Sequence, residues 1–247
     1  MIDIHTHLLP GVDDGSPSIE VSVPVLERFA ADGVTVLVCT PHLNASQIGS
    51  APYAQHVEIL QRLREAAPAV PALLLGWEIM LDAPGADLTS MELTLGGSRA
   101  LLVEFARGGM PRGAGAELRR IARSGRTPVI AHPERYFGCT LEAVREWRSF
   151  GVVIQTDVSV LMGRGAPAEL ARGMLAQGLI DILASDNHGD GRSLAAARNW
   201  LADRGGAEHV DLLTRHNAQR LLDDEDPLPV PPLPSSPWDR VKRIFRS

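Results

Sequence analysis

Short apolar runs rich in β-branched residues alternate along the chain with segments whose apolar residues recur at helical spacing. Residues 33–42, 72–79 and 100–106 are strand candidates of this kind, and amphipathic stretches such as 54–67 and 116–125 separate them. Strands that are apolar on both faces and connected through helices are typical of a parallel sheet covered by helices. With this many units in one chain, the pattern predicts an α/β fold related to the (β/α)8 barrel.

The composition changes after Leu222. The following residues start acidic, become rich in proline and end basic, which is typical of a linker and a short tail. We therefore expect a barrel domain over residues 1–226, and a proline-rich linker with a basic amphipathic tail over residues 227–247.

Apolar residues of this tail recur at helical spacing among arginines and a lysine: they are Trp238, Val241, Ile244 and Phe245. Helices with this pattern lie on anionic membranes or dock on partner proteins. We favour a floppy C-terminus over this docking role, because so short a helix is marginal in water.

Composition and charge exclude several classes of protein. The chain has 247 residues, 45% of them hydrophobic, which is enough for a sizeable core. Its net charge of −6 argues against a nucleic-acid partner, because such proteins carry a basic stripe. Two cysteines outside any CxxC pair indicate a reducing compartment. Without a signal peptide or an apolar run of about 20 residues, we expect a cytoplasmic protein, whose tail suits the inner face of the membrane.

Side chains that bind metals stand at the carboxyl ends of the strand candidates. They are His5, His7, His42, Glu78, Glu104, His132, Asp186 and His188. In a barrel of parallel strands these ends converge on one mouth, where active sites are built. A lone histidine is more often a hydrogen-bonded structural residue, but independent structural roles explain so large a set poorly. Buried carboxylates such as Glu78 and Glu104 also require compensating charge, so the sequence predicts a metal cluster.

The spacing of His5 and His7 places both side chains on one face of an extended strand, where they can bind one ion together. Histidine and carboxylate ligands without thiolates suit manganese, iron or zinc. Carboxylates that bridge two ions indicate a multinuclear site, in which the metals lower the pKa of a bound water. This chemistry is typical of a hydrolase.

The ordered motifs HTH, TPH, GWE, VE, AHPERY and ASDNH resemble those of the PHP superfamily, named for polymerase and histidinol phosphatase domains. MIDIHTHLLPGVDDGSPS together with IAHPERY more specifically resembles the manganese-dependent protein-tyrosine phosphatases encoded with bacterial capsule and exopolysaccharide genes. The resemblance extends from Met1 to about Leu222. It implies a distorted (β/α)7 TIM-like barrel with three metal ions at its C-terminal mouth, manganese first, with iron or zinc as alternatives.

The resemblance also implies ligands for each ion. The first ion takes His5, His7, Glu78 and Asp186; the second shares Glu78 and takes Glu104 and His132; the third takes His42, His188 and Asp14, which we prefer over Asp13. Gly15 fits a tight turn that aims this aspartate inward.

In the family, hydroxide that bridges the metals attacks phosphorus, and an arginine neutralises the phosphate. Arg135 matches that arginine, and its planar fork suits two phosphate oxygens at once. Arg192 is the candidate for a second phosphate-binding arginine, and Asp186 and His188 complete the predicted catalytic set. Asp157 stands where relatives have small polar residues, and an acid there could repel an anionic substrate or bind solvent.

Cys139 and Arg145 have the C-x5-R spacing of cysteine-dependent phosphatases. That mechanism requires a glycine-rich loop, whereas the residues between them predict a first helical turn. We therefore expect the spacing to be accidental.

The resemblance implies hydrolysis of phosphotyrosine on a protein, with a bacterial tyrosine autokinase as partner. A small-molecule phosphomonoesterase such as histidinol-phosphate phosphatase is an alternative, because rim loops decide the substrate. A nuclease is disfavoured by the acidic charge. A non-enzymatic binding module stabilised by metal would predict missing ligands, and none is missing. The oligomeric state stays open.

Overall fold

Parallel strand segments form the centre of the molecule over residues 1–106 and 108–233, which the computed structural model describes. They are β1 (Ile2–Thr6), β2 (Val36–Cys39), β3 (His42–Asn44), β4 (Ala72–Leu75), β5 (Glu78–Met80), β6 (Ala100–Glu104), β7 (Thr127–Ala131), β8 (Val153–Asp157) and β9 (Ile182–Ala184). One sheet has the order β1-β2-β4, and the other has the order β3-β5-β6-β7-β8-β9. Every neighbouring pair is parallel, as the apolar runs predict.

Two strands are each broken into two segments. Between β2 and β3, Pro41 lacks the N–H that a sheet ladder needs. Between β4 and β5 lies Gly76, where a Cβ would lie 2.7 Å from Leu95 Cδ2. Counting each broken strand once leaves seven strand positions in the described residues, in agreement with the predicted (β/α)7 barrel.

The first and last strands meet only at their carboxyl ends. Thr6 and Asn187 form an isolated parallel bridge, and His7 N donates to Asn187 O at 2.8 Å. Nearby, Asp186 N donates to His5 O at 3.0 Å. The ring of strands is therefore distorted, and these contacts bring the residues after β9 beside the histidines of β1.

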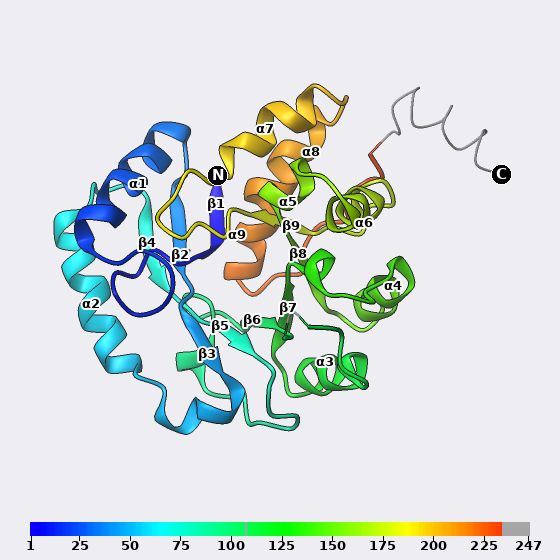
Figure 1. The fold of residues 1–247 in the computed structure, drawn as a ribbon, viewed down its shortest axis with the longest axis horizontal. Coiled ribbons are helices and arrows are strands. Elements are labelled where there is room, and N and C mark those ends of the chain that lie inside the picture. Colours follow the sequence, from blue (N-terminus) through cyan, green and yellow to red (C-terminus); the bar gives the residue numbers. More distant parts are fainter. Residues whose placement is uncertain (107, 234–247) are drawn as a thin grey trace.

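Helices surround the strands (Figure 1), with α1 and α2 on one side and α3, α4 and α6 on the other. Their bounds are α1 (Ile19–Asp32), α2 (Tyr53–Ala66), α3 (Ala114–Arg123), α4 (Leu141–Arg148), α5 (Val158–Met162), α6 (Ala166–Leu175), α7 (Ala195–Ala202), α8 (Ala207–Asp211) and α9 (Asn217–Leu222). In α3, the buried residues Ala114, Leu118 and Ile121 recur at helical spacing and face the sheet.

The character of the interior changes along the strands. An apolar cluster fills the amino-terminal part and includes Val38, Leu102, Val129, Val153 and Ile182. Because alternate residues share a face, Glu104 continues the series of Leu102, and Gln155 that of Val153. The register of β1 against β2 shifts between Asp3 and Thr6, so β1 departs from regular alternation. Polar side chains are thereby gathered at the carboxyl ends.

Residues just after the predicted domain end still pack on the barrel. Leu228 N donates to Asn217 Oδ1 at 2.8 Å, and His209 Nε2 lies 2.8 Å from Pro231 O. Val230 and Leu233 are buried. The predicted amphipathic tail, residues 238–245, lies outside the described residues.

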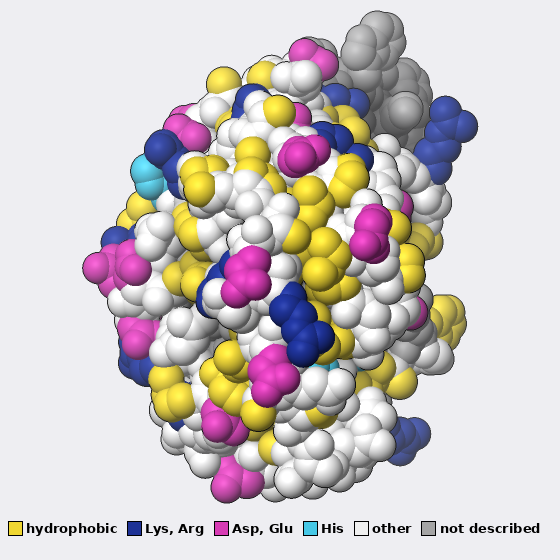
Figure 2. Space-filling model, turned by 90° about the vertical axis from the view of Figure 1, so that its left-hand side faces the viewer, with side chains coloured by type: hydrophobic (Ala, Val, Ile, Leu, Met, Phe, Trp, Pro, Cys, Tyr) yellow, Lys and Arg dark blue, Asp and Glu magenta, His cyan; other side chains and the backbone are white. Residues whose placement is uncertain are grey.

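The described surface carries mixed charge on the side of α1 and α2. Figure 2 shows acidic, basic and hydrophobic side chains interspersed over this face, with no basic stripe among the described residues there. In the described ranges, no helix combines the length and apolar character needed to cross a membrane.

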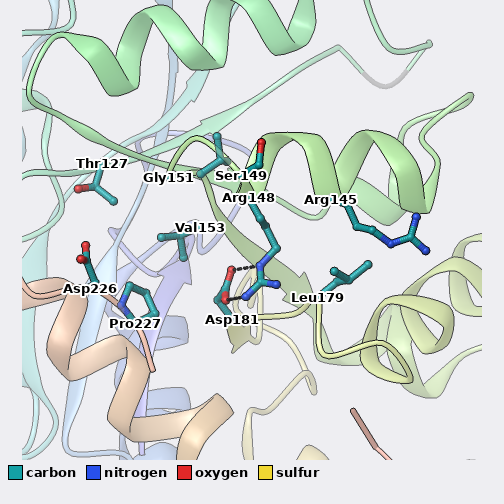
Figure 3. A pocket seen from close by; sticks show the side chains of 11 residues that line it. Thr127, Arg145, Arg148, Ser149, Gly151, Val153, Leu179, Asp181, Asp226 and Pro227 are labelled. Atoms are coloured by element: carbon teal, nitrogen blue, oxygen red, sulfur yellow. Dashed lines mark hydrogen bonds and ion pairs between the residues drawn. The ribbon is translucent and has the colours of Figure 1, made fainter. Parts of the chain in front are cut away.

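A pocket of about 510 Å³ lies at the amino ends of β7 and β8 (Figure 3). It is at the end of the barrel opposite to the polar side chains gathered at the carboxyl ends of the strands. Arg148 of α4 donates to Asp181 through Nη2 at 2.7 Å and Nε at 3.2 Å. Asp181 Oδ2 also accepts from Ile154 N at 2.9 Å. Side chains at this end of a barrel serve stability, and this pair connects α4 to the sheet.

Candidate metal centre

Two histidines at the end of β1 meet at the barrel mouth. The Nε2 atoms of His5 and His7 lie 3.2 Å apart, and both side chains are fully buried. His5 Nε2 lies 3.3 Å from Glu78 Oε2 and 3.4 Å from Asp186 Oδ1. His7 Nε2 lies 3.2 Å and 3.4 Å from the same two oxygens. The predicted convergence of the two histidines is confirmed.

The second ring nitrogen of each histidine fixes its tautomer. His5 Nδ1 lies 3.0 Å from Gln155 Oε1, and His7 Nδ1 lies 2.7 Å from Asp13 Oδ2. Both oxygens are acceptors, so each Nδ1 donates and, in neutral rings, each Nε2 carries a lone pair. Two lone pairs that face each other beside two carboxylates repel unless a cation lies among them. The donor set therefore fits a divalent metal ion, whose histidine ligands are usually oriented in this way.

Glu78 contacts four histidines. Its Oε1 lies 2.8 Å from His132 Nε2, and its Oε2 lies 3.0 Å from His42 Nδ1 in addition to the contacts with His5 and His7. Burial alone would raise the pKa of Glu78, but the histidines hold it well below its usual range. Conversely, burial lowers the pKa of His5, and the carboxylates of Glu78 and Asp186 outweigh this effect and raise it to about 9. The carboxylates of this centre therefore favour a positive charge among them, carried either by protonated histidines or by a cation.

Backbone strain coincides with this centre. His132 has φ of 34° and Asp186 has φ of 49°, two of the three positive values at non-glycine positions in the described residues. Non-glycine residues rarely adopt a positive φ, and such backbone strain concentrates at functional sites. His132 directly follows β7 and Asp186 follows β9 after one residue, so the unusual backbone stands in both cases at a strand end beside the mouth.

A more open group lies beside the buried one. Asp14 Oδ1 is 3.2 Å from His42 Nε2 and 3.6 Å from His188 Nε2. Asp13, by contrast, bonds to His7 Nδ1 and accepts from His42 N at 3.3 Å. Of the two neighbouring aspartates, Asp13 thus orients a histidine, while Asp14 shares a cluster with three histidines.

All predicted ligands come together within the described residues. Their donor atoms fall into four overlapping groups, each within 4.8 Å: His7, Asp14, His42 and His188; His5, Glu78 and His132; His5, His7 and Asp186; His42, Glu78 and Glu104. These groups overlap with the predicted sets without coinciding with them: His7 also joins Asp14, His42 and His188, while Glu104 groups with His42, and His132 with His5. Glu104 Oε2 is still only 3.8 Å from His132 Nε2.

Both predicted arginines reach this centre. Arg135 ends the short 3₁₀ turn η3 (Pro133–Arg135), and its Nη2 donates to Asp186 Oδ2 at 2.7 Å and to Asp157 Oδ2. Arg192 Nη1 lies 3.4 Å from Asp186 Oδ2, and its Nε and Nη2 bond to Asp190. Asp157, which the sequence could not explain, is thus the buried partner of Arg135.

Sequence reasoning missed residues that orient the ligands. Gln155 and the orienting role of Asp13 depend on contacts with histidines that only the fold brings close. The signal for Gln155 is its position two residues after Val153 on an inward face, where a polar residue at a strand end points to the mouth.

Cys139 is not arranged as a nucleophile. Thr140 caps α4, and its side chain accepts from Ala143 N, so the predicted helical turn is confirmed. Burial raises the pKa of the Cys139 thiol to about 12, and the nearby Glu134 adds to the effect. Arg145 bonds to Gln177 instead.

Buried histidines and carboxylates at the carboxyl ends of a parallel barrel define a metal-dependent barrel enzyme. Within that class, the chain belongs to the family of capsular polysaccharide synthesis proteins CpsB/CapC, whose match covers residues 1–223. This membership confirms the capsule-associated resemblance.

Named relatives are similar over nearly the whole chain. The chain is 31% identical to the tyrosine-protein phosphatase CpsB of Streptococcus pneumoniae, covering 91% of this chain and 99% of that protein. It is 28% identical to the tyrosine-protein phosphatase YwqE of Bacillus subtilis, over 95% of this chain and 96% of that one.

Solved structures agree with the fold. One from a study of YwqE and CpsB, described as unique metal-dependent tyrosine phosphatases, has a TM-score of 0.79 at 28% identity, over 96% of this chain and 100% of that one. A dihydropyrimidinase from Brevibacillus agri has a TM-score of 0.51 at 12% identity, over 93% of this chain and 72% of that one, and supports the barrel fold alone.

Proposed function

We propose that this chain is a metal-dependent tyrosine-protein phosphatase that acts in capsule or exopolysaccharide synthesis. The observation that carries the proposal is the contact of Glu78 with four histidines at the barrel mouth. Both the family and the names of the relatives support a phosphatase built on this centre.

The centre would hold three ions, manganese in the first place, with iron or zinc as alternatives. Such ions neutralise charge on a phosphoryl group and lower the pKa of water. The proposed ligands are those of the sequence analysis: His5, His7, Glu78 and Asp186; Glu78, Glu104 and His132; Asp14, His42 and His188. Glu78 suits a shared ligand because its two oxygens point to different histidines.

Arginines would bind and orient the phosphate. Arg135 approaches from η3 with its side chain 18% exposed, and Arg192, with its side chain 25% exposed, reaches the same oxygen of Asp186, Oδ2. Charge-assisted hydrogen bonds from both guanidinium groups would stabilise the transferring phosphoryl group. Asp186 contacts both arginines through Oδ2 and the histidines through Oδ1, His188 among them, and these two residues complete the proposed catalytic set.

The proposed substrate is a phosphotyrosine on a bacterial tyrosine autokinase that controls polysaccharide assembly. This assignment rests on the family and on the names of its phosphatases. We place the reaction in the cytoplasm, at the inner face of the membrane, where such a kinase presents its tyrosines.

Phosphate release after metal removal and restoration tests the proposal. The full chain is stripped with a chelator, reloaded with Mn²⁺, and given a tyrosine-phosphorylated peptide or histidinol phosphate. We expect faster release from the peptide, and none after His132→Ala or Asp186→Ala. His216→Ala is the matched control, because His216 is exposed and lies outside the centre. A preference for histidinol phosphate would contradict the assignment of phosphotyrosine as substrate. Absence of phosphate release from both substrates would overturn the proposed phosphatase activity.

A further inference from the structure

Asp157 is held firmly at the end of β8. Its side chain is fully buried, and its Oδ1 accepts from Ser159 N at 2.6 Å, which caps α5. Its own backbone N donates to Glu134 Oε1 at 2.9 Å. These contacts leave the other carboxylate oxygen, Oδ2, directed at Arg135.

One nitrogen of Arg135 serves two carboxylates. Nη2 donates to Oδ2 of Asp157 and to Oδ2 of Asp186, so both of its hydrogens are used. A guanidinium binds two oxygens in a bidentate manner along one of two edges, either Nη1 and Nη2 or Nε and Nη2. Because Nη2 belongs to both edges, the predicted two-oxygen grip on phosphate is blocked while both carboxylates remain in place.

Asp157 is the carboxylate that can be separated from the metal centre. Asp186 Oδ1 lies close to His5, His7 and His188, so Asp186 is part of the proposed ligand set. Among the described residues, the one cation paired with Asp157 is Arg135. A change at Asp157 therefore alters the arginine without removing a proposed metal ligand.

We propose that Asp157 competes with phosphate for Arg135 and keeps the affinity of the site for phosphate low. The inference rests on the proposed function, because it takes Arg135 as the phosphate-binding arginine. Asp157 acts through Arg135 and is a positioning residue. With its pairing intact, Arg135 meets a phosphate through single hydrogen bonds, which favours release of the phosphate product.

Asp157→Asn separates this role from the helix cap. Asparagine caps helices as well as aspartate does, so its oxygen keeps the bond to Ser159 N. Its amide nitrogen then replaces Oδ2, cannot accept from Arg135, and leaves one hydrogen of Nη2 available. Asp157→Ser is the second variant, because serine also caps but does not reach Arg135.

The experiment measures binding of inorganic phosphate to the Mn²⁺-loaded full chain by calorimetry, and kcat and KM for the phosphotyrosine peptide. We expect Asp157→Asn and Asp157→Ser to lower the Kd of phosphate at least fivefold and to lower KM in parallel, with unchanged manganese content. In an Arg135→Ala background, Asp157→Asn should change neither quantity. Asp181→Asn is the matched control, because it removes another buried carboxylate paired with an arginine, at the opposite end of the barrel.

Unchanged or weaker phosphate binding by both variants would overturn the inference, as would equal tightening in the Arg135→Ala background, since Asp157 would then act without the arginine. Failure to detect phosphate binding by any form would overturn it as well. If the wild type binds phosphate but does not hydrolyse the peptide, the proposed function fails, and the competition between Asp157 and phosphate is still decided by the Kd values.

Discussion

Gly15 packs directly against the backbone of His7. A Cβ atom at position 15 would lie 2.2 Å from the carbonyl oxygen of His7 and 2.3 Å from its Cβ. The same carbonyl accepts from Ser16 N at 2.8 Å. The sequence analysis explains Gly15 by a tight turn. The structure gives a different reason: Gly15 does not have a positive φ, and the close approach to His7 is what requires a glycine. The loop that carries Asp13 and Asp14 is thereby fastened to the strand end that carries His7.

We expect Gly15→Ala to weaken manganese binding and to reduce phosphate release from the phosphotyrosine peptide about 100-fold. The added methyl group must push His7 or the aspartate loop away, and a displacement of about 1 Å at a reacting centre has an effect of this size. Metal titration and kinetics of the purified variant measure both. Gly49→Ala is the control, because a Cβ there would meet nothing within 4 Å beyond its own local backbone. Wild-type affinity and rate in Gly15→Ala would show that the contact does not position His7.

The fold was largely predictable because a parallel barrel leaves a strong pattern. Strands buried on both faces are apolar throughout, and residues that interrupt the pattern at strand ends converge on the mouth. Pro41 marks the division between β2 and β3 in the sequence itself, but the close approach of Gly76 to Leu95 between β4 and β5 joins residues distant in sequence and was not predictable.

Which side chains converge at the site could be predicted, but their orientation could not. His5 and His7 are recognisable from spacing alone. Their tautomers depend on Gln155 and Asp13, and Gln155 is brought close by the sheet order. The pairing of Asp157 with Arg135 likewise joins β8 to the turn after β7. Such contacts are set by tertiary packing, which leaves no periodic signal in the sequence.

Cys139 should be dispensable for activity. At pH 8 the raised pKa, about 12 against an ordinary 9.0, leaves a thiolate fraction roughly a thousandfold below that of an unperturbed cysteine. We expect Cys139→Ser to keep the wild-type rate and iodoacetamide to leave the folded enzyme active. Mass spectrometry of folded and denatured protein checks the chemistry, because both cysteines become reactive on unfolding. Rapid inactivation that follows alkylation of Cys139 would contradict this prediction.

The Arg148–Asp181 pair should contribute to stability and not to catalysis. Arg148→Met leaves the buried carboxylate of Asp181 without its cation, which destabilises the fold by about 3 kcal/mol. Burial already raises the pKa of Asp181, and loss of Arg148 raises it further. A carboxyl with a raised folded-state pKa opposes folding when ionised, so the loss should be larger at pH 8 than at pH 5. Urea unfolding at both pH values measures it.

The matched control for this pair is the double variant Arg148→Met with Asp181→Asn. It removes the buried charge together with its partner, so it should recover part of the lost stability and reduce the pH dependence. The Mn²⁺-loaded enzyme should turn over the peptide at the wild-type rate in both variants, because the pair lies at the amino ends of the strands. A tenfold loss of kcat in the folded variants would contradict a purely structural role.

Manganese binding should release protons at neutral pH. In the metal-free protein the carboxylates of Glu78 and Asp186 outweigh the effect of burial and raise the pKa of His5 to about 9, so this histidine is protonated at pH 7. A metal ligand must be deprotonated, so Mn²⁺ competes with this proton below pH 9 and the competition disappears as the pH rises through 9. We expect the apparent affinity to increase up to about tenfold per pH unit between pH 7 and 9. Calorimetric titrations at pH 7 in two buffers of different ionisation enthalpy measure the proton release directly. A binding enthalpy that is the same in both buffers would show that the histidines are already neutral before the metal binds.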